Sequence, residues 1–139
     1  MARVSYFGMG PMESYCDKHH AASHGYFSST IWQQHEDYIR PQENGSHYDC
    51  DYVQLDGAGI KLTAVGAKSF CFNASHYTQE ELTEKAHNYE LHPCDSTVLC
   101  LDYAQNGIGS ASCGPRLAEQ YRLDDASFDF SIRLIPEKA

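Results

Sequence analysis

Apolar and polar residues alternate along several short stretches of this chain, and the alternation predicts β-strands. The clearest stretch is FDFSIRLI at 128–135, where every second residue from Phe128 to Leu134 is apolar. That period turns one face of an extended segment towards a core and the other towards solvent, as in a half-buried antiparallel strand. GIKLTAV at 59–65 and SFCFN at 69–73 supply two shorter candidates. We therefore expect a mostly-β fold.

Two further segments indicate where their strands lie in the sheet. STVLCLDY at 96–103 is apolar at both parities from Val98 to Leu101, which is typical of a central strand covered on both faces. The alternation that begins at Tyr48 changes parity after Tyr52. Such a slip predicts a β-bulge near Tyr52.

One short helix is predicted near residues 79–89. Thr78 precedes Glu81 by three positions, the spacing at which a cap hydroxyl and a glutamate carboxylate satisfy each other's backbone N–H groups. Three residues would then share the apolar face of the helix: Leu82, Ala86 and Tyr89. We expect His92-Pro93 to end it.

The segment YIRPQENGSHYDCDY at 38–52 opens like a strand, turns and resumes. Pro41 fixes φ and gives up a backbone donor, and Asn44-Gly45 tolerates left-handed conformations, so we expect a corner here. The strand after this corner should re-enter the sheet. A length of 139 residues is that of about one domain, and we expect a single antiparallel β-sandwich over 1–139.

Charge excludes some classes of partner. Ten Lys and Arg residues against nineteen Asp and Glu residues give a formal net charge of −9, which repels nucleic acid and anionic lipid. No stretch reaches the roughly 18 apolar residues of a membrane span, and the first ten residues lack a basic segment followed by an apolar run. We expect a cytoplasmic protein whose partners include neither nucleic acid nor a membrane.

Cysteine and histidine are frequent, but their spacing indicates no metal site. Six cysteines occur, at 16, 50, 71, 94, 100 and 113. We expect free thiols, with Cys50 and Cys100 facing apolar groups, because nothing marks secretion and the length needs no disulfide framework. His20 and His24 lie four residues apart beside Asp17, yet no third ligand stands at a characteristic spacing. We expect no bound metal.

Two sets of residues could act on or bind a sugar. Acidic residues near turns could supply the two carboxyl groups that glycoside hydrolysis needs: Glu13, Asp17, Glu36, Glu43, Asp49 and Asp51. Pairs arise by chance among nineteen acids, so this signal is weak. Trp32, with Tyr26, Phe27 and Tyr38, could form an aromatic platform for a sugar ring, but aromatics more often fill a β-sandwich core, which we favour.

Five segments together resemble, in order, the C-terminal small-chain domain of β-galactosidases of glycoside hydrolase family 2. They are YFGMGPMESYCDK (6–18), YIRPQENGSHYD (38–49), FCFNASHYTQEELTEKAHNYEL (70–91), CLDYAQNGIGSASCGP (100–115) and FDFSIRLIP (128–136). The family pattern GP-x-E-x-Y-x-D-R stands here as GPMESYCDK, with Lys18 in place of arginine. That replacement exchanges a planar bidentate donor for a point charge.

This resemblance implies a fold and a role. The expected fold is about the second half of a galactose-mutarotase-like supersandwich, and both catalytic glutamates would lie on a separate TIM-barrel domain. The chain would then be a noncatalytic domain that completes the pocket and subunit contacts of a β-galactosidase. Its partners would be the remaining domains or large subunit, with Mg²⁺ and a monovalent cation bound in other domains. A carbohydrate-binding module is the alternative, and an isolated half-sandwich would self-associate.

The resemblance also implies roles for individual residues. The residues with a structural role in the family motifs are Gly10, Pro11, Glu13, Tyr15, Asp17, Pro41, Gln42, Glu43, Gly45, His87, Gly114 and Pro115. Some family members line the galactose pocket with an aromatic residue placed shortly before the segment that contains Phe70 here. This chain has Ala64-Val65-Gly66-Ala67 at that place and no aromatic residue, so the loop at 63–68 would approach the pocket through its backbone or through Lys68. The candidates to lie near the substrate are Thr63, Gly66 and Lys68, with Trp32 as a further candidate.

Overall fold

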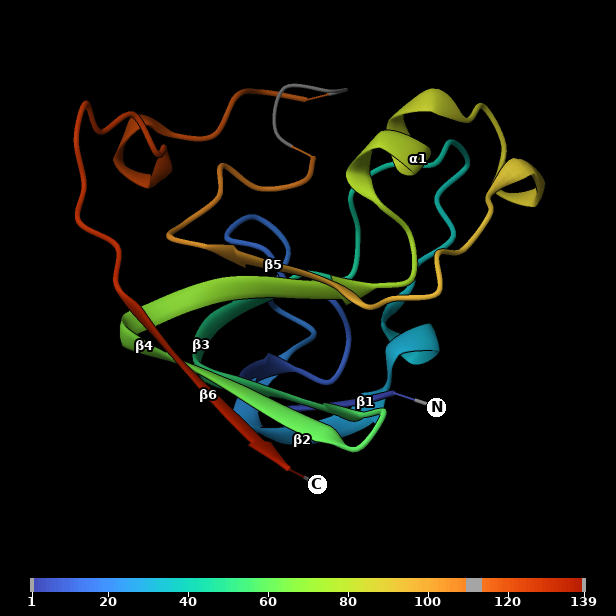
Figure 1. The fold of residues 1–139 in the computed structure, drawn as a ribbon. Helices are drawn as coiled ribbons and strands as arrows, with labels where there is room; N and C mark the ends of the chain where they lie inside the picture. The colour runs from blue at the N-terminus through green and yellow to red at the C-terminus, as the bar shows by residue number, and fades with distance from the viewer. Residues whose placement is uncertain (1, 110–113, 139) are drawn as a thin grey trace.

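Six antiparallel strands form one open sheet in the computed structural model, which describes residues 2–109 and 114–138 (Figure 1). The strands are β1 (Arg3–Gly10), β2 (Ser23–Thr30), β3 (His47–Gly57), β4 (Ile60–Ser75), β5 (Val98–Asp102) and β6 (Ile132–Lys138). Their order is β2-β1-β3-β4-β5, and β6 also pairs with β4. One α-helix, α1 (Gln79–Glu84), and three short 3-10 helices, Ile31–Gln34, Asn88–Glu90 and Glu119–Tyr121, complete the regular structure. The predicted mostly-β antiparallel class with one short helix is confirmed.

Strands β3 and β4 form a hairpin whose two-residue turn requires left-handed backbone. Ala58 and Gly59 have φ angles of 53° and 77°. Such mirror-image turns match the right-handed twist of the flanking strands. The hairpin therefore fixes the register in which Leu55 faces Leu62.

Strand β4 is a single long strand with a sharp bend, where the sequence pattern predicted two separate strands at 59–65 and 69–73. From the pair Tyr52–Val65 to the pair Cys50–Phe70, β3 advances by two residues whereas β4 advances by five. The predicted irregularity near Tyr52 is therefore confirmed. A Cβ on Gly66 would lie 2.1 Å from the carbonyl oxygen of Lys68. Only glycine fits this bend.

The bend gives β4 different partners along its length. Its first half, up to Gly66, pairs with β6, and its second half, from Cys71, pairs with β5. The segment 96–103 was predicted to hold a central strand, but β5 lies at an edge of the sheet and its residues are only partly buried.

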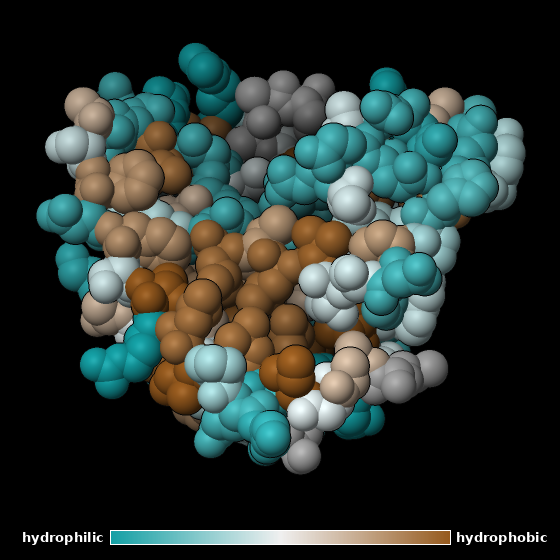
Figure 2. All heavy atoms as spheres, in the orientation of Figure 1, coloured by the Kyte–Doolittle hydropathy of each residue, from teal (hydrophilic) through white to brown (hydrophobic). Residues whose placement is uncertain are grey.

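The core lies on one face of the bent sheet. Val4, Tyr6, Val53, Ala64 and Phe72 are buried there. Cross-strand neighbours share a face in an antiparallel sheet, so residues of β5 and β6 that pair with buried positions of β4 point to the same side. Figure 2 shows apolar side chains gathered on this side, in the region between β5 and β6. We call the exposed part of it the open apolar face, formed by Leu99, Leu101, Ile132 and Leu134.

Two predicted elements are shorter than expected. The predicted half-buried strand at 128–135 begins only at Ile132, because the rings of Phe128 and Tyr103 stack with centroids 4.6 Å apart instead of joining the sheet. The helix begins with Thr78 as its cap, as predicted, since its hydroxyl accepts from the Glu81 N–H at 3.1 Å. The Glu81 carboxylate instead accepts from the His92 N–H at 2.8 Å. The helix ends at Glu84 rather than before His92-Pro93.

The apolar face expected for that helix is reduced to one residue. Leu82 is buried, whereas Ala86 and Tyr89 lie beyond the helix and are exposed. Because only one side chain of this segment packs inward, a longer helix would gain little burial.

Candidate functional site

The carboxylate of Glu13 is buried and carries three hydrogen bonds. It accepts from the Lys18 ammonium, the Tyr38 hydroxyl and the backbone N–H of Gly45, the last at 2.8 Å. Burial alone would raise the pKa of Glu13, but these donors together hold it below its ordinary value. Glu13 therefore stays ionised and binds backbone rather than solvent.

The corner at 41–46 is fixed by contacts on every side. Gly45 has a φ of 67°, and a Cβ there would lie 2.1 Å from the carbonyl oxygen of Gln34. Asn44 accepts from the Glu36 N–H at 2.9 Å, and the Tyr15 hydroxyl accepts from the Ser46 N–H at 3.4 Å. The corner follows an irregular segment, because residues 38–40 form no strand, and β3 begins directly after it, as predicted.

Asp17 holds the loop at 105–109 in the same way. Its two carboxylate oxygens accept from the N–H groups of Ile108 and Gly109 at 3.0 and 3.1 Å. Gly107 has a φ of 87°, and a Cβ on it would lie 2.3 Å from Asp17 Cγ. The family-motif segment 10–18 therefore contacts both the corner and this loop through polar side chains.

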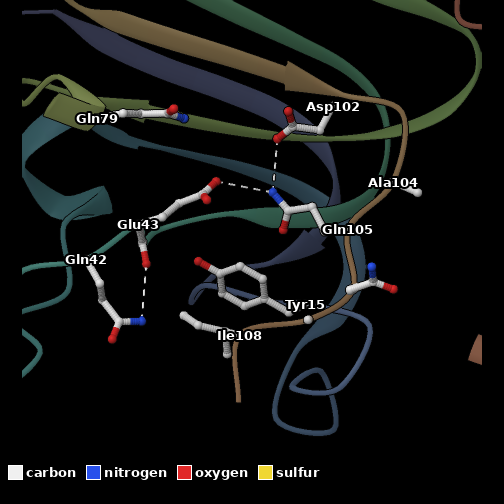
Figure 3. A pocket seen from close by; sticks show the side chains of 10 residues that line it. Tyr15, Gln42, Glu43, Gln79, Asp102, Ala104, Gln105 and Ile108 are labelled. Atoms are coloured by element: carbon white, nitrogen blue, oxygen red, sulfur yellow. Dashed lines mark hydrogen bonds between the residues drawn. The ribbon is translucent and has the colours of Figure 1, made fainter. Parts of the chain in front are cut away.

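A hollow of about 530 Å³ lies between the corner and the loop (Figure 3). Six polar side chains line it, from the corner, α1, the end of β5 and the loop: Gln42, Glu43, Gln79, Asp102, Gln105 and Asn106. The amide nitrogen of Gln105 donates to Asp102 Oδ2 at 3.0 Å and to Glu43 Oε1 at 3.4 Å. Glu43 Oε1 also accepts from Asn73 Nδ2 at 3.2 Å. The neutral side-chain amides of Asn73 and Gln105 thus fix the carboxylates of Glu43 and Asp102 beside each other.

The electrostatic potential in this hollow is negative, because Glu43 and Asp102 line it. Burial, and after it the charge of Asp102, raises the pKa of Glu43 above its ordinary value. The lining residues described by the structure include no lysine or arginine. The arrangement can accept hydrogen bonds from hydroxyl groups and disfavours anions.

The four candidates to lie near the substrate occupy different surroundings. The Thr63 hydroxyl accepts from Gln54 Nε2 at 2.9 Å within the sheet, and Gly66 forms the bend of β4. Lys68 lines a second hollow. The Trp32 ring contacts His76, with centroids 4.6 Å apart.

The aromatic residues divide between core and surface. The preference for a core was wrong for Trp32 and Tyr26, which are 45% and 60% exposed, because the 3-10 helix and the edge strand β2 that carry them lie at the border of the sheet. Phe27 packs against the core, and Tyr38 binds Glu13.

The remaining motif residues have separate local roles. A Cβ on Gly10 would lie 2.2 Å from the Tyr6 hydroxyl oxygen, and the bond from Gly10 to Pro11 is cis. His87 stacks on Tyr89, with centroids 5.1 Å apart. Three further positions complete the set: Pro41 is buried, and Gly114 and Pro115 are exposed.

The two histidines that suggested a metal pair have other contacts. His24 Nε2 lies 3.1 Å from the Asp49 carbonyl oxygen, and the rings of His20 and His19 meet edge to face. Over residues 2–109 and 114–138, the side chains of His, Cys, Asp and Glu do not gather in threes that could hold a metal ion. In the same part of the chain, helices are too short or too polar to cross a membrane.

Five cysteines are free thiols in the structure: Cys16, Cys50, Cys71, Cys94 and Cys100. Cys50 is buried among apolar groups as expected, but Cys100 is only half-buried because β5 is an edge strand. Cys113 lies outside the described residues.

Among the buried polar residues that sequence reasoning missed is His47. Its ring packs between Tyr6 and Phe72, its Nδ1 lies 3.0 Å from the Met9 carbonyl oxygen, and its Nε2 contacts the side-chain amide of Gln34. Burial lowers the pKa of His47 to about 4. Its neighbours in sequence are polar, so no hydrophobic pattern marked this position.

Comparison with known proteins places the chain in a family. The sequence profile described as beta galactosidase small chain matches residues 1–134. The β-galactosidase of Actinobacillus pleuropneumoniae is 52% identical over 135 residues, which make up 97% of this chain and 13% of that protein. The β-galactosidase of Staphylococcus xylosus is 43% identical over 132 residues, with 95% and 13% covered. That of Kluyveromyces lactis is 33% identical over 129 residues, with 93% and 12% covered.

The chain spans only about 13% of the length of the first two of these relatives. The profile nevertheless covers all of the strands except the end of β6. This chain belongs to the beta galactosidase small-chain family.

Proposed function

We propose that this chain is a noncatalytic C-terminal domain of a glycoside hydrolase family 2 β-galactosidase. In that enzyme it would complete the architecture of the sugar pocket and the contacts between subunits. The observation that carries the proposal is the family match over residues 1–134, which corresponds to 12–13% of enzymes named as β-galactosidases. A segment of that size supplies one domain of a much larger enzyme.

The open apolar face supports a role inside a larger assembly. Leu134 is 55% exposed on the side of the sheet that carries the buried core residues, and Leu99 and Leu101 are only partly buried there. Apolar surface of this kind marks a contact with another protein layer. In the complete enzyme, other domains or the large subunit would cover it, as expected for about half of a supersandwich.

The geometry of Glu13 and Glu43 supports a noncatalytic role. Glu13 is buried, and its donors hold its pKa low, so it is a poor proton donor. Glu43 is bound by the amides of Asn73 and Gln105. Retaining glycosidases need one acid and one nucleophile that face the same sugar carbon, and these two residues have different structural tasks.

The other domains of the complete enzyme would supply its active site and its metal ions. Terminal β-galactosides such as lactose would reach this chain only through the active site of the larger protein. Mg²⁺ and a monovalent cation would bind in other domains, and the enzyme would act in the cytoplasm.

Fragment complementation tests the proposal. The β-galactosidase of A. pleuropneumoniae, shortened by its matching 13%, would be mixed with this chain and assayed with a chromogenic β-galactoside. We expect neither component to be active alone and the mixture to regain activity. Turnover by this chain alone, abolished by Glu13→Gln or Glu43→Gln, would contradict the proposal, as would a mixture of two folded components that forms a complex but stays inactive.

A further inference from the structure

The hollow beside Glu43 combines the size and the polarity of a small-ligand site. It is open to solvent and has a volume of about 530 Å³, within the range of ligand pockets in proteins. Its polar lining comes from three segments that are distant in sequence, 42–43, Gln79 and 102–106, and Figure 3 shows these side chains around a common space. Two of its walls are irregular segments, the corner and the loop. The carboxylates of Glu13 and Asp17 bind their backbone N–H groups and so hold them in place. The site is therefore built before any ligand arrives.

Free hydrogen-bond acceptors remain on its two carboxylates. Gln105 occupies one oxygen of each group, Asp102 Oδ2 and Glu43 Oε1. Among the residues that the structure describes, the other two oxygens, Asp102 Oδ1 and Glu43 Oε2, accept no hydrogen bond. A ligand with several hydroxyl groups would donate to these oxygens, and charge-assisted hydrogen bonds of this kind are stronger than neutral ones.

The surrounding amides can serve the same ligand. Gln42 and Gln79 line the hollow, and each amide carries both a donor and an acceptor. A hydroxyl group also donates and accepts, so a polyol matches such a lining at both kinds of atom. The negative charge of the wall rejects phosphates and carboxylates.

We propose that this hollow binds a neutral saccharide through adjacent hydroxyl groups, with Glu43 and Asp102 as acceptors and Gln42 and Gln79 as further partners. This inference goes beyond the proposed function, because the binding requires no other domain of the enzyme. A metal ion is disfavoured as the occupant, since no three ligating side chains meet within the described residues.

Amide NMR spectra of the 139-residue chain test the proposal. The probe is methyl β-D-galactoside, titrated to about 100 mM, because small polar ligands bind with millimolar Kd. We expect shifts at the backbone amides of Gln42, Glu43 and 102–108 and at the side-chain amide of Gln79. Galactose 6-phosphate at the same concentration should give smaller shifts.

Variants that remove charge without changing shape locate the site. Glu43→Gln and Asp102→Asn should each weaken binding about five- to tenfold, because a neutral amide oxygen is a poorer acceptor than a carboxylate. Asp56→Asn is the matched control: Asp56 is exposed on β3, away from the lining, and its loss should leave Kd unchanged. The dispersion of each spectrum reports whether the variant is folded.

Several outcomes would overturn the inference. They are a folded chain without shifts at about 100 mM galactoside, shifts at other residues, equal binding by the Asp102→Asn variant and the native chain, or the same shifts produced by Na⁺ or Mg²⁺ alone. Complementation separates this result from the proposed function. A chain that restores activity but binds no galactoside would contradict only the binding site.

Discussion

A hydrogen bond of 2.8 Å joins the carboxylate of Glu13 to the backbone N–H of Gly45, across 32 positions of sequence. It connects the family-motif segment 10–18 to the corner that precedes β3. Two side chains, Lys18 and Tyr38, donate to the same carboxylate. One buried charge therefore adds to the other contacts that hold the corner.

Replacing that charge should destabilise the fold. Glu13→Gln should lower the free energy of unfolding at pH 7 by about 1–3 kcal/mol, because the buried Gly45 N–H loses a charged acceptor. The Lys18 side chain is 51% exposed, so its ion pair alone contributes little. Urea denaturation measures the loss.

Glu36→Gln provides the control for Glu13, because Glu36 is exposed and, within the described residues, contacts the corner through its backbone N–H rather than its side chain. The effect of Glu13 should also depend on pH. Since its folded pKa is lowered, its contribution is present above the unfolded value of about 4.3 and is lost as the pH falls through the folded value. Equal stability of the two variants at pH 7 would contradict this account.

His47 should make the chain sensitive to mild acid. Its pKa is about 4 when folded and about 6.5 when unfolded, so the unfolded state binds the proton first as the pH falls. Stability should be highest above pH 6.5 and should decline towards pH 4, by roughly 3 kcal/mol from this residue. His47→Phe should flatten that decline in urea denaturation series at several pH values. An unchanged pH dependence would show that His47 does not titrate in this way.

Gly45 and Gly59 have similar backbone angles, so alanine substitutions at the two positions distinguish the cost of a left-handed backbone from the cost of a steric clash. Gly45 and Gly59 have φ angles of 67° and 77°, but only at Gly45 would a Cβ meet backbone, at 2.1 Å from Gln34 O. Gly59→Ala should cost about 1–2 kcal/mol from conformation alone. Gly45→Ala should cost at least about 3 kcal/mol, because the corner must also move. Thermal unfolding compares them, and equal losses would argue against the collision.

The isolated chain should self-associate through its open apolar face. We expect light scattering to detect dimers or larger species that become fewer with Leu134→Asp, because a charge there opposes burial. Tyr89→Asp is the control, since Tyr89 is 84% exposed but lies outside this face. A strictly monomeric native chain would contradict the prediction.

The thiols should differ in reactivity. Burial raises the pKa of Cys50 and raises that of Cys71 to about 11, and the thiolate is the reactive form. Under denaturing, non-reducing conditions all six cysteines should react with a thiol reagent. In the native chain, Cys94 should react before Cys50 and Cys71, as mass spectrometry of labelled peptides can show. Fewer than six reactive thiols after denaturation would indicate a disulfide.

The sequence pattern predicted strands well where apolar residues face a core. It located β3 and the β3–β4 irregularity because Val53 and Leu55 carry apolar side chains at alternate positions. It gave no sign of β1, whose inward positions include Gly8 and Gly10. These glycines make room for Cys50 and Tyr6, so packing replaces hydrophobicity as the reason for the strand.

The candidate site shows the same division. The family motif directed attention to Glu13, Asp17 and Glu43, which all make contacts around the corner and the loop. Asp102 and Gln105 were not singled out, because their roles come from distances between segments rather than from spacing along the chain. Strand β2 was also missed, since an edge strand rich in serine has no apolar period.

The bend at Gly66 has a consequence for how the molecule opens. Strand β4 holds β6 with one half and β5 with the other, and within the described residues β5 and β6 do not pair with each other. Each outer strand can therefore detach while its counterpart remains hydrogen-bonded, so native-state amide exchange should resolve two separate opening units. The two parts of the sheet, β5 with the second half of β4 and β6 with the first half, could then adjust independently to whatever covers the open apolar face.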